Sequence, residues 1–328
     1  MIEILLKEWI ERVKYYIHLI ADYSIKESQV GAVLDDVLNL SGKMLRSKLL
    51  LLCAFLGSNW KDNKEKICKL AAMVELTHLA SLIHDDIVDD SPYRRGKVSI
   101  QGKYGKDAAV FAGDFLIARI FYYGAVENLN EAVSILSKTV EYMCIGEIEQ
   151  DLCRYQEDIS EKKYFENIER KTAALFQAAS YIGAKEAGCS EEIIQKLKLF
   201  VKNLGLMFQL KDDILDFTSN SKELGKETHK DFQNGIYTFP VIMALKNPKA
   251  REVLLPIMRK NKEEKLSLAE ILQLQNYIIQ FGGIEASYEK IKSLSNINRQ
   301  LIKELGKNLE ITFYLEKMLG ELEEKNEK

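Results

Sequence analysis

The sequence predicts an all-α protein. Apolar residues recur at intervals of three and four from the start, as in Ile2, Leu5, Leu6, Trp9 and Ile10, with little of the alternation typical of strands. The chain has only 4 prolines, and the first of them is Pro92. Several segments are apolar around much of their circumference, so we expect a single-domain bundle of antiparallel helices around a deep central cavity.

The elements follow one another in a regular order. Helical periodicity continues through residues 2–20, 49–56, 67–82, 108–123 and 132–148. Polar residues, glycine and proline predict loops at residues 57–59, 90–98, 128–130, 219–228 and 247–248. No linker or low-complexity tract divides the chain, so residues 1–328 are predicted to form one domain. The charged tail from Glu321 onward is expected to fray.

Composition restricts the partners and the compartment. The chain has 328 residues, of which 47% are apolar, and its net charge of −3 argues against a nucleic-acid partner. The 5 cysteines show no CxxC spacing, which favours reduced thiols. Residues 1–10 do not resemble a signal peptide, and the longest apolar run, residues 49–56, is too short to span a bilayer. We therefore expect a cytoplasmic protein.

Two widely separated segments carry the same pattern of carboxylates at i, i+1 and i+4. On a helix, i and i+4 share a face and i+1 lies about 100° round. Three like charges on one turn repel one another unless a cation lies among them. Mg²⁺, which prefers oxygen ligands, is the expected cation. The predicted ligands are Asp85, Asp86 and Asp89 in the first segment and Asp212, Asp213 and Asp216 in the second.

Each acidic segment is followed by a basic loop. Pro92 and Gly96 end the first helix, so Arg94 and Arg95 lie just beyond its carboxylates. Lys226 follows the second segment within a polar loop. Guanidinium groups beside a metal-binding surface indicate a bridged anion, and diphosphate fits because arginine binds it in a bidentate manner.

Four further short segments complete the pattern: Gly42-Lys43 with Arg46, Gly146-Glu147 with Gln150, Lys171-Thr172, and Gly235 with Thr238 and Pro240. Together with the two acidic segments, they resemble the trans-isoprenyl diphosphate synthases (polyprenyl synthetase family) from about residue 40 to residue 285. The resemblance implies the isoprenoid synthase fold, a site with about three Mg²⁺ ions, and two substrates, isopentenyl diphosphate and an allylic diphosphate.

The resemblance also implies residue roles. The isopentenyl diphosphate pocket would consist of Lys43, Arg46, His78 and Arg95, and the allylic diphosphate pocket of Arg94, Lys171 and Lys226. Thr172 and Gln209 would direct oxygen dipoles at the developing cation, so they form the catalytic group with Lys171. Three residues depart from the family pattern: Ser41 and Ser47 replace a glycine and a proline, and Ile236 replaces a frequent lysine.

Product length is predicted from the helix before Asp85. Ala80 and Ser81 lie one turn below the metal ligands, and Thr77 lies another turn below. Short-chain members of the family often carry an aromatic residue at this level, whereas these three side chains are small. An open tunnel is therefore expected, with a hexaprenyl to octaprenyl product of about C30 to C40. Phe115, Ile120 and Phe121 are candidates for the tunnel floor.

Several alternatives remain at this point. The chain could be the catalytic subunit of a two-component synthase, or a geranylgeranyl or farnesyl diphosphate synthase. A terpene cyclase does not need a second diphosphate pocket, and a non-enzymatic scaffold does not need six intact motif aspartates. Family resemblance implies a homodimer, with a small partner subunit as the alternative. The hydrophobic product would then be handed to a membrane.

Overall fold

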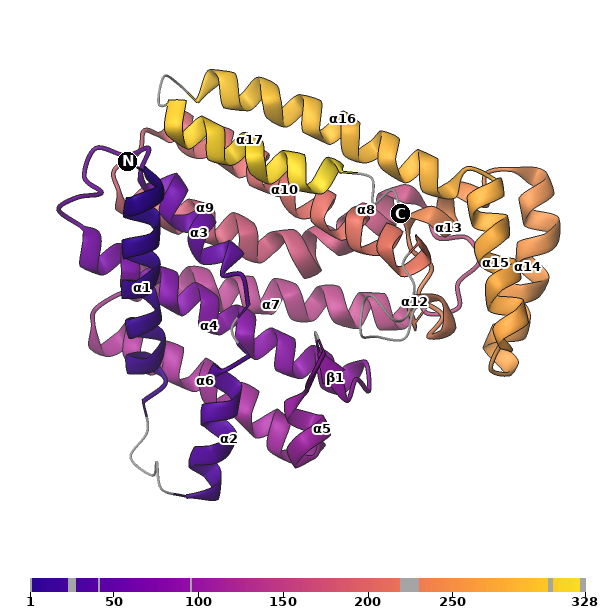
Figure 1. Ribbon diagram of the computed structural model, residues 1–328, viewed down its shortest axis with the longest axis horizontal. Helices are drawn as coiled ribbons and strands as arrows, with labels where there is room; N and C mark the ends of the chain where they lie inside the picture. Colours follow the sequence, from indigo (N-terminus) through magenta and orange to yellow (C-terminus); the bar gives the residue numbers. More distant parts are fainter. Residues whose placement is uncertain are drawn as a thin grey trace. The chain divides into compact units, whose positions relative to one another are not determined.

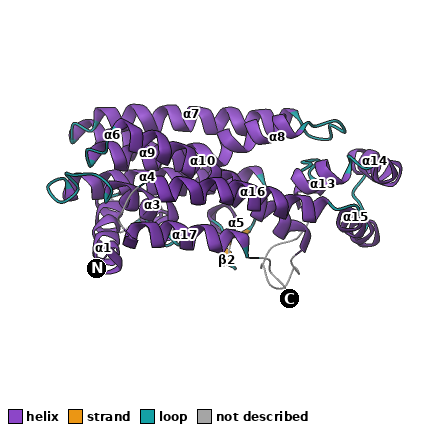
Figure 2. Ribbon diagram, turned by 90° about the horizontal axis from the view of Figure 1, so that it is seen from above, coloured by secondary structure: helices purple, strands orange, loops and turns teal. Residues whose placement is uncertain are grey.

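A computed structural model describes residues 2–22, 28–40, 42–94, 96–218, 230–305 and 309–324. Over these residues the all-α prediction is confirmed, and helices dominate the view in Figure 2. A two-stranded antiparallel hairpin, β1 (Tyr93–Arg94) and β2 (Lys97–Val98), lies where a loop was predicted. The helices, including the π-helical turn η1, are α1 (Ile2–Ile20), α2 (Gln29–Leu38), α3 (Leu45–Ala54), α4 (Lys64–Val88), α5 (Ile100–Tyr104), α6 (Lys106–Val126), α7 (Asn130–Leu152), α8 (Glu161–Ile168), η1 (Glu169–Ala173), α9 (Ala174–Glu186), α10 (Glu191–Thr218), α12 (Lys230–Gln233), α13 (Phe239–Ala244), α14 (Pro248–Glu263), α15 (Leu268–Gln280), α16 (Gly283–Glu304) and α17 (Leu309–Glu323).

The chain divides into two compact units, each assembled from separate stretches of sequence. Unit 1 contains residues 1–141, 175–199 and 307–312, and unit 2 contains residues 142–174, 200–306 and 313–328. The first acidic segment belongs to unit 1 and the second to unit 2. The prediction of one domain with a central cavity stays a prediction.

Unit 1 is built around α4, which packs against α1, α3 and α6 (Figure 1). Because α4 is covered by neighbours on several sides, most of its residues from Ile67 to Ala80 are buried. Trp9 of α1 anchors one end of this core, with ring centroids 5.0 Å from Phe55 and 5.7 Å from Trp60. Such aromatic clusters contribute a large share of the buried apolar area.

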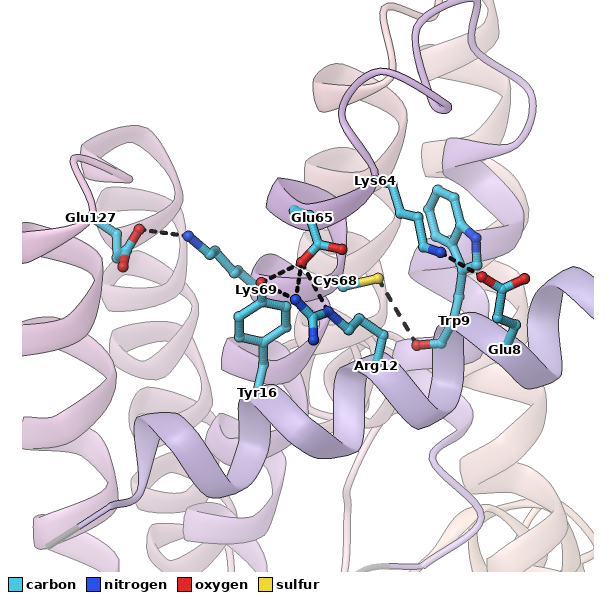
Figure 3. Close-up of polar contacts among 9 residues, drawn as sticks. All are labelled: Glu8, Trp9, Arg12, Tyr16, Lys64, Glu65, Cys68, Lys69 and Glu127. Atoms are coloured by element: carbon cyan, nitrogen blue, oxygen red, sulfur yellow. Dashed lines mark hydrogen bonds and ion pairs between the residues drawn. The ribbon is translucent and has the colours of Figure 1, made fainter.

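Polar contacts fix the orientation of α1 on α4 (Figure 3). Arg12 and Tyr16 both donate hydrogen bonds to Oε2 of Glu65, with Arg12 Nε at 2.8 Å. Lys69, one turn further along α4, pairs with Glu127 after α6 at 2.6 Å. Burial, followed by the bond to Glu65, raises the pKa of Tyr16 to about 12. Tyr16 therefore stays protonated and donates to Glu65 over the whole neutral range.

Unit 2 has its own hydrophobic core, centred on Phe232, Leu254 and Ile278. Helices α14 and α15 lie side by side, and α13 packs on α16 (Figure 1). Helix α15 begins with a capping box in which Ser267 and Glu270 exchange hydrogen bonds. A buried amide pair, with Asn203 Nδ2 2.9 Å from Asn298 Oδ1, joins α10 to α16.

The expectation that the tail frays from Glu321 is wrong for residues 321–323, which complete α17. Arg299 holds both carboxylate oxygens of Glu323, and Lys211 donates to the main-chain oxygen of Glu324. These contacts stabilise the end of the helix. Residues 325–328 lie outside the described part of the chain.

Among the described residues, two helices are long and apolar enough to span a membrane by length and composition alone, which corrects the estimate from residues 49–56. They are α4 and α6, and the most apolar windows of the two helices are 72% and 39% buried inside the protein. The burial of α4 is that of a core helix. All 5 cysteines are free thiols, in agreement with the sequence.

Candidate active site

The first acidic segment forms the carboxyl-terminal end of α4. Asp85 is half-buried and Asp89 is exposed, whereas Asp86 is only 2% exposed. Arg94 Nε donates to Asp86 Oδ1 at 2.8 Å, and Gln101 donates to the main-chain oxygen of Asp86. The i and i+4 carboxylates thus point outward, and the i+1 carboxylate anchors the loop that follows.

The hairpin β1–β2 presents Arg94 to the acidic segment. Tyr93 pairs with Val98 and Arg94 with Lys97, and Gly96 takes the positive φ of 75° that the tight turn requires. Ser99 Oγ donates to Ser91 O at 2.7 Å and closes the base of the hairpin. The predicted contact residue Arg95 lies outside the described residues.

The predicted isopentenyl diphosphate pocket is partly assembled within unit 1. Arg46 Nη1 lies 2.8 Å from His78 Nε2, and the guanidinium carbon lies 4.6 Å from the ring centroid of Phe176. Lys43 is exposed in the loop before α3. The structure therefore brings Arg46 and His78 together. Phe176, which stacks on the guanidinium, was not singled out by sequence.

Unit 2 contains a hydrogen-bonded chain of four side chains. Thr172 Oγ1 donates to Gln209 Oε1 at 2.8 Å, and Gln209 Nε2 donates to Asp213 Oδ1 at 2.9 Å. The last hydrogen bond of this series runs from the hydroxyl of Tyr164 to Asp213 Oδ2, at 2.5 Å. The predicted catalytic residues Thr172 and Gln209 are thus in direct contact, on η1 and α10.

Asp213 has an unusual environment. It is only 1% exposed, and burial raises its pKa to about 7 despite the lowering effect of its hydrogen bonds from Tyr164 and Gln209. The negative charges of Asp231 and Asp212 raise it further. Asp212 is exposed and Asp216 half-buried, so the second segment repeats the first, with an inward carboxylate at i+1.

Lys171 and Thr172 lie in the π-helical turn η1, and such turns are frequent at functional sites. Lys171 Nζ pairs with Glu147 Oε2 at 3.0 Å. Two glycines make room for this wider turn. A Cβ at Gly146 would lie 2.9 Å from the Lys171 nitrogen, and a Cβ at Gly205 would lie 2.8 Å from Ala173 Cα. The glycine of the Gly-Glu-x-x-Gln segment therefore has a steric role.

The candidate chain-length residues lie along α4. Ala80 and Thr77 are buried, at 0% and 2% exposure, and Ser81 is half-buried. Both hydroxyls are bonded to carbonyls of their own helix, Thr77 to Met73 and Ser81 to His78. Among the floor candidates on α6, Ile120 is buried and Phe115 and Phe121 are half-buried.

The side chains available as metal ligands are the carboxylates of the two acidic segments. Within the described ranges, no three side chains of His, Cys, Asp or Glu gather closely enough to hold a metal ion by themselves. The more exposed carboxylates, Asp85 and Asp89 on α4 and Asp212 and Asp216 on α10, are oxygen ligands of the kind that Mg²⁺ prefers, and Oδ2 of Asp216 is buried. Lys226, the predicted cation after the second segment, lies outside the described residues.

Besides Phe176, sequence reasoning assigned no role to three further residues at these sites. Tyr164 and Asp231 act on Asp213, and Glu75 hydrogen-bonds to Ser47 beside Arg46. An acidic residue inside an otherwise apolar stretch, as in Val74-Glu75-Leu76, was the available signal for Glu75. Tyr164 and Asp231 carried no comparable signal, because their role depends on contacts across the fold.

The sequence profile of the family described as Polyprenyl synthetase matches residues 27–275. The chain belongs to this family. It is 34% identical over 265 residues to heptaprenyl diphosphate synthase component 2 of Geobacillus stearothermophilus, with 80% of each chain covered. It is also 34% identical to the chloroplastic solanesyl-diphosphate synthase 2 of Oryza sativa subsp. japonica, covering 84% of this chain and 67% of that protein.

Solved structures agree with this assignment. A polyprenyl synthase from Caulobacter crescentus, complexed with calcium and isoprenyl diphosphate, superimposes with a TM-score of 0.87 at 29% identity and covers 98% of this chain and 96% of its own. The heptaprenyl diphosphate synthase of Staphylococcus aureus gives a TM-score of 0.83 at 26% identity, covering 98% and 99%. The chain is thus a prenyltransferase with the all-α isoprenoid synthase fold.

Proposed function

We propose that this polyprenyl synthetase condenses isopentenyl diphosphate with an allylic diphosphate in repeated cycles, giving an all-trans product. The observation that carries the proposal is that each acidic segment comes with its own polar group: Arg94 at Asp86, and the group of Lys171, Thr172 and Gln209 beside Asp213. Residues 1–328 are proposed to act as one synthase domain, since the proposed reaction uses both acidic segments.

The metal is proposed to be Mg²⁺, about three ions per site, held mainly by Asp85, Asp89, Asp212 and Asp216. Bound there, it would offset the charge that develops on the departing diphosphate. Asp86 and Asp213 complete the six proposed ligands, and each also accepts hydrogen bonds from side chains, Asp86 from Arg94 and Asp213 from Tyr164 and Gln209.

The protein's own groups have distinct tasks. Arg94, Lys171 and Lys226 bind the allylic diphosphate, and they stabilise its charge more as the carbon–oxygen bond breaks. Thr172 and Gln209 turn oxygen dipoles toward the allylic cation. The double bond of isopentenyl diphosphate, which is held by Lys43, Arg46, His78 and Arg95, then attacks that cation. The departed diphosphate accepts the proton that is lost, and the apolar bundle excludes water.

The product is proposed to be of medium to long chain, about C30 to C40, because Ala80, Ser81 and Thr77 are small. The heptaprenyl and solanesyl diphosphate synthases among the relatives support this length class. A geranylgeranyl or farnesyl product is the shorter alternative, and the "component 2" relative supports a two-component synthase as the second.

The purified chain, incubated with farnesyl diphosphate, labelled isopentenyl diphosphate and Mg²⁺, should give hexaprenyl to octaprenyl products on sizing by chromatography. Ala80→Phe should shorten the product without lowering the melting temperature, because the ring would enter the tunnel. Ala72→Phe on the same helix is the control. It should lower the free energy of unfolding by about 1–3 kcal/mol, because the ring would overfill a packed core. If Ala80→Phe loses stability but keeps its product length, Ala80 is not part of the tunnel wall. If the purified chain is active only after a second subunit is added, the two-component synthase is favoured.

We further propose a homodimer. Phe111, Tyr122 and Val126 are 70%, 61% and 60% exposed and lie along one face of α6. A small partner subunit is the alternative occupant of this face.

A membrane is the proposed acceptor of the product. No nucleic-acid partner is proposed. The proposed location is the cytoplasm, with the burial of α4 as support.

A further inference from the structure

The proposal concerns a buried carboxylate outside the acidic segments. Glu75 of α4 is only 6% exposed. Its Oε2 accepts two hydrogen bonds from Ser47, from the hydroxyl at 2.8 Å and from the backbone nitrogen at 3.3 Å. Burying a carboxylate costs free energy unless hydrogen bonds compensate for the lost water. The two bonds from Ser47 provide such compensation and tie Glu75 to the segment that contains Ser47.

Through Ser47, Glu75 contacts the first turn of α3. The N-cap residue Met44 makes no side-chain capping bond and takes a left-handed conformation, with φ 51°, although it is not a glycine. The backbone N–H groups of a first turn need partners, and a negative charge there is favourable. Glu75 meets both needs from a different helix, so it replaces the missing local cap.

Arg46 lies directly before Ser47 in this turn. Its guanidinium is placed between His78, at 2.8 Å, and the ring of Phe176. Glu75 and His78 are three residues apart on α4 and therefore share a face. One face of α4 thus supplies both the group that fixes the turn and the group that contacts Arg46.

We propose that Glu75 and Ser47 are a positioning pair that sets the affinity for isopentenyl diphosphate by fixing Arg46 and the loop of Lys43. The inference rests on the proposed function and deepens it. In the family pattern a proline stands at position 47, which restricts φ but has no N–H to donate. In this chain, two hydrogen bonds to Glu75 fix the turn instead.

The test is the binding of isopentenyl diphosphate to the full chain in EDTA, measured by calorimetry. Glu75→Gln should weaken binding about tenfold, or about 1.4 kcal/mol, because a neutral amide accepts a weaker hydrogen bond than a carboxylate. Ser47→Ala should weaken it less, about threefold, since the backbone N–H remains. The double variant should bind no more weakly than Glu75→Gln alone, because Ser47 acts on the turn through its contact with Glu75. Ser47 Oγ also lies 3.1 Å from Ala71 O, a hydrogen bond within the fold that only Ser47→Ala removes.

Steady-state kinetics supplies the second readout. The KM for isopentenyl diphosphate should rise in Glu75→Gln, while kcat and the KM for farnesyl diphosphate stay within about twofold. Two controls should leave all three unchanged. Ser287→Ala removes a buried hydroxyl bonded to Gly283 O at 2.8 Å, and Glu65→Gln removes a structural carboxylate of the same helix α4.

Three results would overturn the proposal: unchanged isopentenyl diphosphate affinity in a folded Glu75→Gln, an equal rise of both KM values, or independent multiplicative effects of the two single changes. If Glu75→Gln does not fold, the affinity of Ser47→Ala for isopentenyl diphosphate becomes the test, and an unchanged affinity would overturn the proposal. A wild-type chain that neither binds isopentenyl diphosphate nor turns over would remove the proposed function itself, so the two failures can be told apart.

Discussion

At the residue scale, the central aspartate of each acidic segment differs from its neighbours. Asp86 and Asp213 are buried and hydrogen-bonded, whereas Asp85, Asp89, Asp212 and Asp216 are exposed or half-buried. The helix geometry explains this, because i+1 lies about 100° from the face shared by i and i+4. Each segment therefore combines a more exposed i and i+4 pair, the main proposed metal ligands, with a buried i+1 carboxylate that accepts hydrogen bonds from neighbouring side chains.

Tyr164→Phe tests the anchor in the second segment. The change removes one of two donors to a buried carboxylate, so the free energy of unfolding in urea should fall by about 1.5–3 kcal/mol. The Mg²⁺ concentration needed for half-maximal turnover should rise, because Asp213 no longer holds α10 in one position.

The control is Tyr237→Phe, which removes a buried hydroxyl of unit 2 with a longer bond of 3.4 Å to Met258 O. It should leave the Mg²⁺ dependence unchanged. Equal Mg²⁺ dependence in Tyr164→Phe and the wild type would show that Tyr164 serves packing alone.

Sequence could predict much of the chemistry at this scale but not the contacts that support it. Spacing alone placed the i and i+4 carboxylates of each segment, Asp85 with Asp89 and Asp212 with Asp216, on one face of their helix. Tyr164 could not be found, and Glu75 could be noticed only as an acidic residue in an apolar stretch, because their partners Asp213 and Ser47 lie 49 and 28 residues away in the chain. Such pairs follow from tertiary packing, which local patterns do not report.

At the scale of elements, long helices followed from periodicity, but two local features did not. The hairpin β1–β2 is too short to alternate visibly, and the π-helical turn η1 has no apolar period of its own. The turn depends on close approach at two glycines on other helices, Gly146 on α7 and Gly205 on α10. This explains in steric terms why small residues stand there.

Gly146→Ala and Gly205→Ala should each displace η1, because the new methyl would meet backbone or Cβ atoms closer than 3.0 Å. We expect a stability loss of about 1–3 kcal/mol, as for overpacking, and at least about tenfold lower kcat. Thermal melting and steady-state rates would measure both.

Gly320→Ala is the matched control, since nothing lies within 4 Å of its Cβ position on α17. It should raise stability by about 0.5–1 kcal/mol, because alanine favours a helix interior. If all three variants behaved alike, helix propensity rather than the π-helical turn would explain the glycines.

At the scale of the whole molecule, the proposed site residues are divided between the two units. The first acidic segment, Arg46 and His78 belong to unit 1, and the second segment, Lys171 and Thr172 belong to unit 2. The residues proposed for the two diphosphate pockets are not all in one unit, so the proposed reaction needs the complete chain. The two-unit organisation was not predicted, because each unit combines stretches that are distant in sequence.

The proposed homodimer can be tested at this scale. Phe111→Glu places a charge on the exposed apolar face of α6, so the mass measured by sedimentation should fall from that of two chains to one. Ile4→Glu, at a 72% exposed position of α1, should leave the dimer intact. A wild-type chain that sediments as a monomer would contradict the homodimer and direct attention to a separate subunit.

The release of pyrophosphate, measured with each substrate alone and with both, is the most direct test of the central claim. We predict release only when farnesyl diphosphate, isopentenyl diphosphate and Mg²⁺ are all present. EDTA should abolish it, and Asp85→Asn and Asp212→Asn should each lower it by a factor of about 100 or more. Comparable release from farnesyl diphosphate alone, or release that does not need the metal, would contradict the account.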